Sequence, residues 1–236
     1  VVKPMRTQSL EVALIDLGVF GPRPGNRFSA PNPNLKPEYV TSIDAGVKVG
    51  SESFSGELIA FRSNYRDKIT SVLTGNVVDG ALEVQNRNVA KLELWGIEAG
   101  ARYRIAAPDL ELYATATYTR GDEDTDTGTM PADRIPPLFG KVGARWQVRE
   151  KLGLEAYGLY AAGQKRLSAR DRVDPRIDPA GTAGWATLNA RIAWRASERL
   201  DLALRAENLG DRRYREHGSG LDEPGRNFIL TADYHF

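Results

Sequence analysis

Residues 110–118 read LELYATATY, a stretch in which apolar and polar side chains alternate. Leu112 and Tyr118 share one parity with alanines, whereas Glu111 and Tyr113 lie with threonines on the other parity. Because successive side chains of a β-strand point to opposite faces, such a strand has one apolar face and one polar face. The stretch therefore predicts an amphipathic β-strand.

The same alternation recurs along most of the chain. It is clear in residues 43–49, 95–103, 142–148, 188–194 and 200–206, and it is less regular in residues 54–65. Counting such segments gives nine strands after residue 38. The sequence therefore predicts an all-β chain.

The lengths of the links between these strands help to choose between two all-β architectures. Long links fall near residues 73–90, 121–137, 164–184 and 211–226, and each pair of long links is separated by a short one. In an antiparallel up-and-down meander all the long links then lie at one end, as in outer-membrane barrels. A soluble sandwich explains the alternation alone, but gives no reason for this regularity.

Two further features of the strands favour a membrane barrel. The apolar parity contains many alanines and glycines, which fill a sandwich core poorly but are acceptable against lipid tails. Tryptophan and tyrosine lie near strand ends, where amphipathic rings would meet a membrane interface. We predict an antiparallel up-and-down transmembrane β-barrel over residues 39–236, a fragment of nine or ten strands from a larger barrel.

Composition excludes several other classes of protein. Charged residues make up 27% of the chain, and no apolar run approaches the roughly 18 residues that a membrane helix needs. Lys and Arg number 32 against 31 Asp and Glu, so no nucleic-acid partner is expected. The chain has no cysteine and 2 distant histidines, and no nucleophile pair is recognisable. We therefore expect neither an enzyme nor a protein with a bound cofactor.

The first residues raise the question of completeness. Residues 1–10 do not resemble a signal peptide, so either export is not used or the true N-terminus lies upstream. Residues 1–38, rich in proline and glycine over 21–37, are expected to form mainly an external loop and the tail of an upstream strand. Because barrels of this class have even strand numbers, we expect further strands upstream, unless residues 1–16 form a full tenth strand.

Several local sequences resemble the C-terminal barrel half of TonB-dependent receptors. Residues 208–214, NLGDRRY, resemble the family's Asn-Leu-Phe-Asp-Lys-x-Tyr ending of the penultimate strand, with Gly210 in place of Phe. Residues 224–228, PGRNF, and the terminal Phe236 are similar to the family's closing segment, and residues 32–38, NPNLKPE, are similar to an element before a barrel strand. The motifs occur in the expected order along nearly the whole chain.

This resemblance implies a 22-stranded barrel with a plugged lumen, so the plug, its TonB-contacting segment and upstream strands would lie outside this sequence. It implies a receptor in the outer membrane of a Gram-negative bacterium that takes up a ferric siderophore, haem, cobalamin or another metal complex by TonB-dependent transport. The implied partners are the TonB complex, lipopolysaccharide and the barrel-assembly machinery, with Tyr234 and Phe236 as the assembly signal. A passive porin or a surface-anchoring barrel is the alternative.

The predicted external loops carry the candidate site residues. Two of these loops are basic, and guanidinium groups suit an anionic ligand. The predicted ligand-binding residues are Arg166, Arg170, Arg172, Arg212, Arg215 and His217. Residues 122–126, DEDTD, place carboxylates at alternate positions as calcium loops do, but Gly128 falls one place late and Pro131 interrupts the pattern. A solvated acidic loop is favoured there, and no metal site is predicted.

The charged parity of the strands also requires an explanation. Charged side chains without partners would be costly to desolvate, so we expect water, ion pairs or a polar plug to accompany them. An ion-paired and solvated lumen wall accounts for most of them. They are Asp44, Lys48, Glu98, Arg102, Arg104, Glu111, Lys141, Arg145, Arg149, Glu155, Arg191, Arg195, Asp201, Arg205, Glu207, Asp233 and His235.

Overall fold

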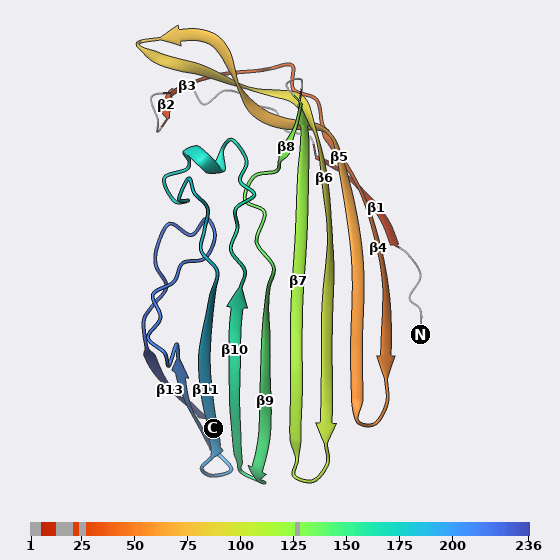
Figure 1. The fold of residues 1–236 in the computed structure, drawn as a ribbon, viewed down its shortest axis with the longest axis vertical. Helices are drawn as coiled ribbons and strands as arrows, with labels where there is room; N and C mark the ends of the chain where they lie inside the picture. The colour runs from red at the N-terminus through yellow and green to blue at the C-terminus, as the bar shows by residue number, and fades with distance from the viewer. Residues whose placement is uncertain (1–5, 13–20, 24–26, 126–127) are drawn as a thin grey trace.

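The computed structural model describes residues 6–12, 21–23, 27–125 and 128–236 (Figure 1). Ten strands follow one another in a single sheet path, β1-β4-β5-β6-β7-β9-β10-β11-β12-β13. Their bounds are β1 Arg6–Val12, β4 Glu38–Gly50, β5 Phe54–Val78, β6 Ala81–Ile105, β7 Leu110–Thr125, β9 Phe139–Arg149, β10 Leu152–Ala161, β11 Trp185–Arg195, β12 Leu200–Glu207 and β13 Asn227–Tyr234. The shorter elements are β2 (Gly21–Arg23), β3 (Arg27–Ala30), β8 (Gly128–Pro131) and the 3₁₀ turn η1 (Asp171–Val173).

The path is an antiparallel up-and-down meander, as predicted. Every pair of neighbours along it is antiparallel, and β4 to β13 are joined in chain order. Figure 1 shows the short links together at the lower end of the sheet and the long links at the upper end. The nine strands predicted after residue 38 are all present.

The N-terminal segment adds strands before β4. Strand β1 pairs antiparallel with β4, from Arg6 opposite Asp44 to Val12 opposite Glu38. Strand β3 pairs with the upper part of β6 in parallel. Residues 1–5, 13–20 and 24–26 lie outside the described part of the chain. Among the described residues β1 and β13 are the outer strands of an open path.

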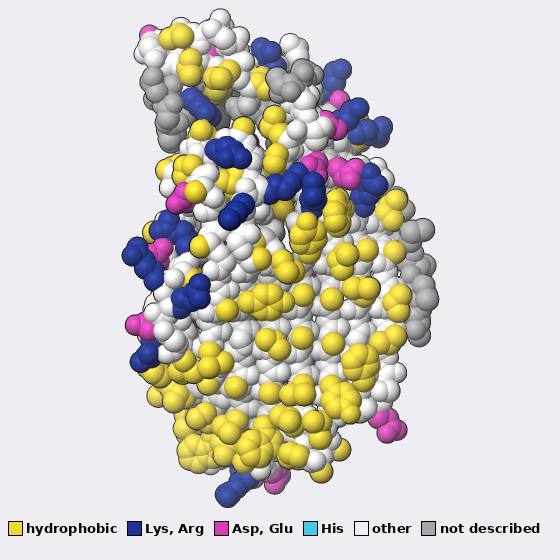
Figure 2. All heavy atoms as spheres, viewed as in Figure 1, with side chains coloured by type: hydrophobic (Ala, Val, Ile, Leu, Met, Phe, Trp, Pro, Cys, Tyr) yellow, Lys and Arg dark blue, Asp and Glu magenta, His cyan; other side chains and the backbone are white. Residues whose placement is uncertain are grey.

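The two faces of the sheet differ as the alternation predicts. Large apolar side chains such as Ile43, Leu58, Ile97 and Val142 are exposed on the outward face, and Ile97 is 42% exposed. Figure 2 shows these side chains as a broad yellow band across the lower sheet, with charged side chains above and below it. An apolar face without a covering layer suits a lipid environment. No helix in the described residues has the length and apolar character needed to cross a membrane.

Aromatic side chains lie at both borders of this band, as the sequence analysis predicts from their positions near strand ends. Tyr103, Trp146 and Trp194 are close to the short links, and all three are exposed. At the opposite border the rings of Trp95 and Tyr118 meet edge to face, with centroids 5.6 Å apart. Amphipathic rings at these two levels mark membrane interfaces.

Residues 73–90, which the sequence analysis treats as a link, are largely strand. β5 and β6 continue as a paired hairpin to a turn at Asp79 and Gly80, whose φ angles of 50° and 78° suit a tight Asp-Gly turn. The register shifts between Tyr65 and Lys68 and again between Leu73 and Val77. Each shift interrupts the period of two, so the alternation that predicts a strand is lost there.

Candidate ligand-binding loops and lumen wall

The long links 121–137, 164–184 and 211–226 pack on one another at the upper end of the sheet. Each of these three links is tied to another by side-chain hydrogen bonds, described below. Between them lies a small buried cluster made of Ala132, Leu167, Ser168, Asp171 and Ile177, each 3% exposed or less. The loops therefore form an ordered layer above the barrel wall.

Asp171 joins two of these links. Its carboxylate accepts hydrogen bonds from the backbone N–H groups of Arg134 and Ser168 at 3.2 Å, and the hydroxyl of Ser168 accepts from the N–H of Asp171 at 2.9 Å. Asp171 is 2% exposed, so these bonds satisfy a buried charge. Asp171 is the first residue of the η1 turn, and the backbone N–H groups at the start of such a turn need acceptors.

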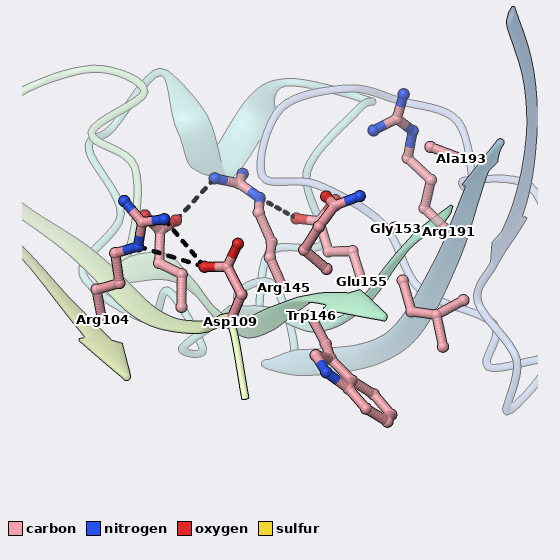
Figure 3. A pocket seen from close by; sticks show the side chains of 11 residues that line it. Arg104, Asp109, Arg145, Trp146, Gly153, Glu155, Arg191 and Ala193 are labelled. Carbon is pink, nitrogen blue, oxygen red and sulfur yellow. Dashed lines mark hydrogen bonds and ion pairs between the residues drawn. The ribbon is translucent and has the colours of Figure 1, made fainter. Parts of the chain in front are cut away.

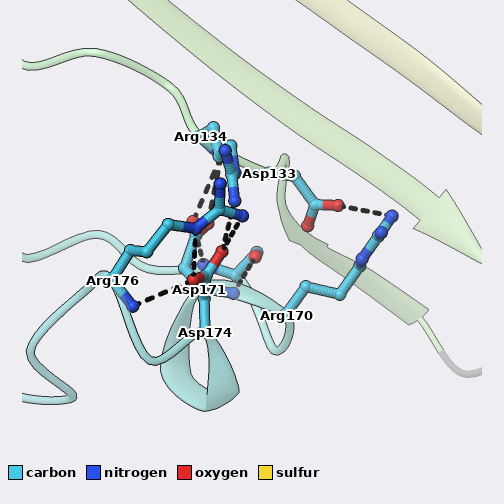
Figure 4. A network of polar contacts seen from close by, with 7 residues as sticks. Asp133, Arg134, Arg170, Asp171, Asp174 and Arg176 are labelled. Atoms are coloured by element: carbon cyan, nitrogen blue, oxygen red, sulfur yellow. Dashed lines mark hydrogen bonds and ion pairs between the residues drawn. The ribbon is translucent and has the colours of Figure 1, made fainter. Parts of the chain in front are cut away.

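Arginines of both links pair with two other aspartates near Asp171, namely Asp133 and Asp174 (Figure 4). Asp174 binds the guanidinium of Arg134 and, at 2.9 Å, that of Arg176. Arg170 pairs with Asp133 at 3.0 Å. Figure 4 shows the arginines converging from both links onto the aspartates. Several charges held in one network are more ordered than isolated surface pairs, which contribute little.

The predicted ligand-binding arginines fall into two groups. Arg166 binds the carboxylate of Asp122 and the carbonyl oxygen of Gly121, Arg170 pairs with Asp133, and Arg215 pairs with Asp222 at 2.8 Å. By contrast, within the described residues neither Arg172 nor Arg212 pairs with a carboxylate; the guanidinium of Arg212 donates to the carbonyl oxygen of Gly184 at 3.1 Å. Both arginines are exposed.

His217 lies at the contact between two links. Its Nδ1 shares a hydrogen bond with the Thr182 hydroxyl at 2.8 Å, while its Nε2 is buried without a hydrogen-bond partner in the described residues. Burial lowers the pKa of His217; the nearby Asp171 opposes this shift and Arg134 adds to it. The neutral ring is therefore favoured in this position.

In the last link Asp222 holds two arginines. Hydrogen bonds from Arg213 and Arg215 lower the pKa of the Asp222 carboxyl. This carboxylate is shared by both guanidinium groups. It stays ionised at neutral pH and fixes the positions of the two side chains.

The acidic run of residues 122–126 does not converge on one point. Asp122 binds Arg120 and Arg166, Asp124 accepts from the Thr129 hydroxyl, and Glu123 pairs with Lys68 at 2.7 Å. Asp126 lies outside the described residues. Within the described part of the chain no group of three or more His, Asp or Glu side chains could hold a metal ion.

The lumen face carries a separate polar cluster. Glu111, Arg145, Glu155 and Arg191 lie opposite one another on neighbouring strands. Arg145 binds Glu111 at 3.1 Å and Glu155 at 3.2 Å, and Trp146 points away from these charges (Figure 3). The two ion pairs of Arg145 are of the kind predicted for the wall, whereas no ion pair of Arg191 is found within the described residues.

Two tyrosines complete the cluster: Tyr113, which the sequence analysis places on the polar parity, and Tyr157, which it does not mention. The hydroxyl of Tyr113 donates to Glu155, and the ammonium group of Lys141 lies over the rings of Tyr113 and Tyr157, 5.1 Å and 3.8 Å from their centroids. Gly143 lies between the two tyrosines in register. A Cβ atom there would approach the Tyr113 hydroxyl to 2.5 Å, so the cluster requires glycine.

Residues 16–209 match the sequence family described as TonB dependent receptor-like, beta-barrel. The chain belongs to this family. It is 32% identical over 233 residues to the heme/hemopexin utilization protein C of Haemophilus influenzae, and 23% identical over 222 residues to the ferric enterobactin receptor PirA of Pseudomonas aeruginosa. These alignments cover 89% and 90% of the chain, and the chain spans 30% of the length of each relative.

Among solved structures the copper transporter OprC has the same fold. It superposes with a TM-score of 0.76 at 19% identity, over 98% of this chain and 36% of that chain. By their names, PirA is a receptor, OprC is a transporter and the Haemophilus relative is a utilization protein; none of the three is named as an enzyme. The chain is thus part of a TonB-dependent receptor barrel, which is an antiparallel transmembrane β-barrel.

The motif of this family at residues 208–214 has a clear structural role. The side-chain amide of Asn208 donates to the carbonyl oxygens of Arg212 at 2.8 Å and Pro224 at 3.2 Å, and its oxygen accepts from the N–H of Arg212. Asp211 accepts from the N–H of Arg226 at 2.8 Å. The two motif segments of this TonB-dependent receptor barrel therefore clamp both ends of its last long link.

The predicted assembly signal lies at the free end of this barrel segment. Tyr234 ends β13, and its ring meets that of Phe236 edge to face with centroids 5.2 Å apart. Both rings are exposed. Nearby, His235, which the sequence analysis places in the lumen wall, lies 3.3 Å from Asp201, another residue of that wall.

Proposed function

We propose that this protein is an outer-membrane receptor of a Gram-negative bacterium that takes up a metal complex by TonB-dependent active transport. The observation that carries the proposal is the ordered layer of arginine-bearing loops, built at one end of a wall that belongs to the TonB-dependent receptor barrels. An open, arginine-rich loop end can collect an anionic complex, and the charged lumen wall below suits a polar path.

The ligand would be a metal chelate with anionic groups, such as a ferric siderophore, haem, cobalamin or another metal complex. Arg172 and Arg212 would make the first contacts, because no carboxylate among the described residues competes for their guanidinium groups. Arg170 and Arg215, whose guanidinium groups are exposed, would exchange their ion pairs for the ligand at small cost. Arg166, whose pair with Asp122 is partly buried, would join them by giving up that pair. His217 would contribute to the same loop end by holding two links together.

Two protein partners belong to the same proposal. The TonB complex would supply energy through a plug domain that fills the lumen. The barrel-assembly machinery would recognise the C-terminal strand through Tyr234 and Phe236, whose rings are exposed beside the unpaired edge of β13 in the described structure.

Uptake by cells that express the complete gene tests this function. Radiolabelled ferric siderophores, haem, cobalamin and copper would be supplied singly at nanomolar concentration to strains with and without TonB. We expect one ligand class to accumulate only when TonB is present. An R172Q/R212Q variant should lower that uptake at least tenfold, because two charge-assisted contacts are lost. A K151Q/R199Q variant, with the same charge change in two short links, should not.

Other outcomes would contradict the proposal. Accumulation of every small solute tested, without TonB and in proportion to concentration, would identify a passive porin. Absence of uptake of all four ligand classes, in cells where the protein is folded at the surface, would favour a barrel that anchors a surface-binding module.

A further inference from the structure

The lumen face of β10, β11 and β12 carries two arginines directly opposite each other. Arg191 of β11 pairs in register with Arg205 of β12, and Glu155 of β10 lies on the other side of Arg191. Ile192 and Leu204, on the other parity, are exposed in the outward apolar band, so both arginines point into the lumen. Like charges directly opposite each other destabilise a sheet. An anion held between the two guanidinium groups would remove this repulsion.

Arg191 has no carboxylate partner in the described part of the chain. Its neighbour Glu155 is occupied on the side away from it, because the donors to the Glu155 carboxylate belong to β7 and β9. These donors are Tyr113, Lys141 and Arg145. Figure 3 shows dashed lines at Arg145 but none at Arg191. The exposed guanidinium of Arg191 can therefore accept an anion from outside this wall.

Arg205 can join Arg191 in binding such an anion. Its one ion pair within the described residues is with Glu207 at 3.1 Å, and its side chain is 47% exposed. Exposed pairs of this kind are weak and exchange readily. Guanidinium groups bind carboxylates with paired hydrogen bonds, so two of them can hold one anionic group from two sides.

The lumen wall is hollowed next to these arginines. A hollow of about 380 Å³ is lined by Arg191, Gly153 and Ala193, and a second of about 350 Å³ shares these three residues and adds Ala203. The small residues lie side by side in register, one row below the arginines towards the short links. The two hollows thus form one trough, whose floor lacks large side chains. Volumes of this order are typical of sites for small ligands.

The carboxylates that line this trough do not neutralise Arg191. Asp109 and Glu111, which line the larger hollow, are paired with arginines of their own, each at 3.1 Å. Asp201 and Asp233 lie opposite each other four residues closer to the short links, about 13 Å along the strands. The end of the trough at Arg191 is therefore its positive end.

The trough lies along the route from the external loops to the short-link end. We propose that Arg191 and Arg205 form an anion-binding site in this half of the lumen, which holds a carboxylate or similar anionic group of the transported complex after it has left the loops. This inference rests on the proposed transport function and adds a second binding site below the loops. An acidic side chain of the domain that fills the lumen is the alternative occupant.

Cysteine labelling of the complete receptor, purified in detergent, tests this site. The chain has no cysteine, and any cysteine upstream would be replaced by serine, so Ala193→Cys places a single thiol in the trough. Two methanethiosulfonate reagents of similar size, one with a sulfonate and one with a trimethylammonium group, are compared at this thiol. Each rate is divided by the rate with a small free thiol. We expect the sulfonate to react at least tenfold faster, because two guanidinium groups attract it.

Variants show whether the two arginines cause this preference. In the Ala193→Cys receptor, R191Q/R205Q should abolish it. R62Q/R120Q makes the same charge change on the outward face, beside Trp95, and should leave the preference unchanged. Citrate, a tricarboxylate, should slow labelling by an uncharged methanethiosulfonate while both arginines are present, and should not slow it in R191Q/R205Q.

The comparison of the two charged reagents keeps both arginines, so it holds even where a variant folds poorly. Equal relative rates would overturn the proposal, as would an unchanged preference in a folded R191Q/R205Q variant. Lack of reaction with either reagent would show that polypeptide covers the trough, and would overturn the assignment to a transported complex. Failure of metal-complex uptake with the sulfonate preference intact would refute the transport function and leave the anion-binding site in place.

Discussion

Single polar side chains, rather than a large apolar core, hold the external loops of this protein together. Asp171 satisfies backbone N–H groups of two links, and His217 shares a hydrogen bond with Thr182 of a neighbouring link. A buried hydrogen bond contributes about 1 kcal/mol, but an unsatisfied buried group costs more. The loop layer is therefore sensitive to changes at single atoms.

Acid is expected to loosen the contact at His217. The pKa of His217 is lowered below its usual value of 6.5 by burial, so the closed contact favours the neutral ring. Above pH 6.5 the ring is neutral in both the closed and the open loop, and the contact is fully stable. As the pH falls below that value the open loop binds protons first, and stability is lost until the lower pKa of the closed state is reached.

Hydrogen exchange of residues 164–184 and 211–226, corrected for intrinsic rates, measures this effect. The wild type should exchange faster in both links at pH 5 than at pH 7.5, because a protonated ring would bury a positive charge and only Nδ1 would have an acceptor, the Thr182 hydroxyl. A His217→Gln variant should exchange alike at the two pH values. The same pH dependence in this variant would assign the effect to other groups.

At the scale of elements, the base of the last link depends on the Asn208 amide. Its Nδ2 faces the carbonyl oxygens of Arg212 and Pro224, so Asn208→Asp would place a carboxylate against two acceptors. Asp adopts the positive φ of 49° found here as readily as Asn does, which removes backbone strain as a cause. We expect this element to lose about 2 to 3 kcal/mol.

Tryptophan fluorescence during unfolding in denaturant reports this change, because Trp185 stacks on Tyr214 of the same link, with ring centroids 4.3 Å apart. The variant should lose the Trp185 signal at lower denaturant concentration than the wild type. Asn34→Asp makes the same charge change at an exposed position and is the matched control. Equal shifts in both variants would show that the effect is electrostatic and not due to the clamp.

The elements also show what the sequence can predict. The strands and the short turns follow from alternation, because one-sided exposure to lipid imposes a period of two on every crossing. The part of the β5–β6 hairpin that extends above the membrane lacks this constraint, and its bulges shift the parity. The sequence analysis therefore treats it as a link. Contacts such as that of Asp171 with Arg134 join links that are distant in the sequence. The sequence of these links has no periodic pattern, so it does not predict such contacts.

The candidate site was predicted only in part, for the same reason. The sequence places arginines in the external links, and the structure describes them there. Which of these arginines are paired depends on tertiary contacts: Arg166 reaches Asp122 across two links, whereas Arg212 meets the backbone of Gly184. Charge counts along the chain cannot separate these cases.

At the scale of the whole molecule, the orientation of the wall in the membrane follows from one face of the sheet. The outward row from Trp95 to Tyr103 extends over eight residue-to-residue steps and is apolar or small below the tryptophan. At 3.4 Å per residue it extends about 27 Å, or roughly 20 Å along the membrane normal for a strand tilted by about 40°. This is close to the apolar band of about 25 Å that such barrels present.

Adjacent residues of β7 therefore give opposite predictions for the same substitution. Ala116 lies opposite Ala99, midway along this outward row, while Thr117 faces the lumen opposite Glu98. Ala116→Arg should destabilise the folded protein in lipid vesicles by about 2 to 4 kcal/mol, because the guanidinium meets the bilayer midplane. Thr117→Arg should change stability far less, since Glu98 can pair with it. Denaturant titration of both variants in the same vesicles measures the difference; equal destabilisation would mean that the assignment of the two faces is wrong.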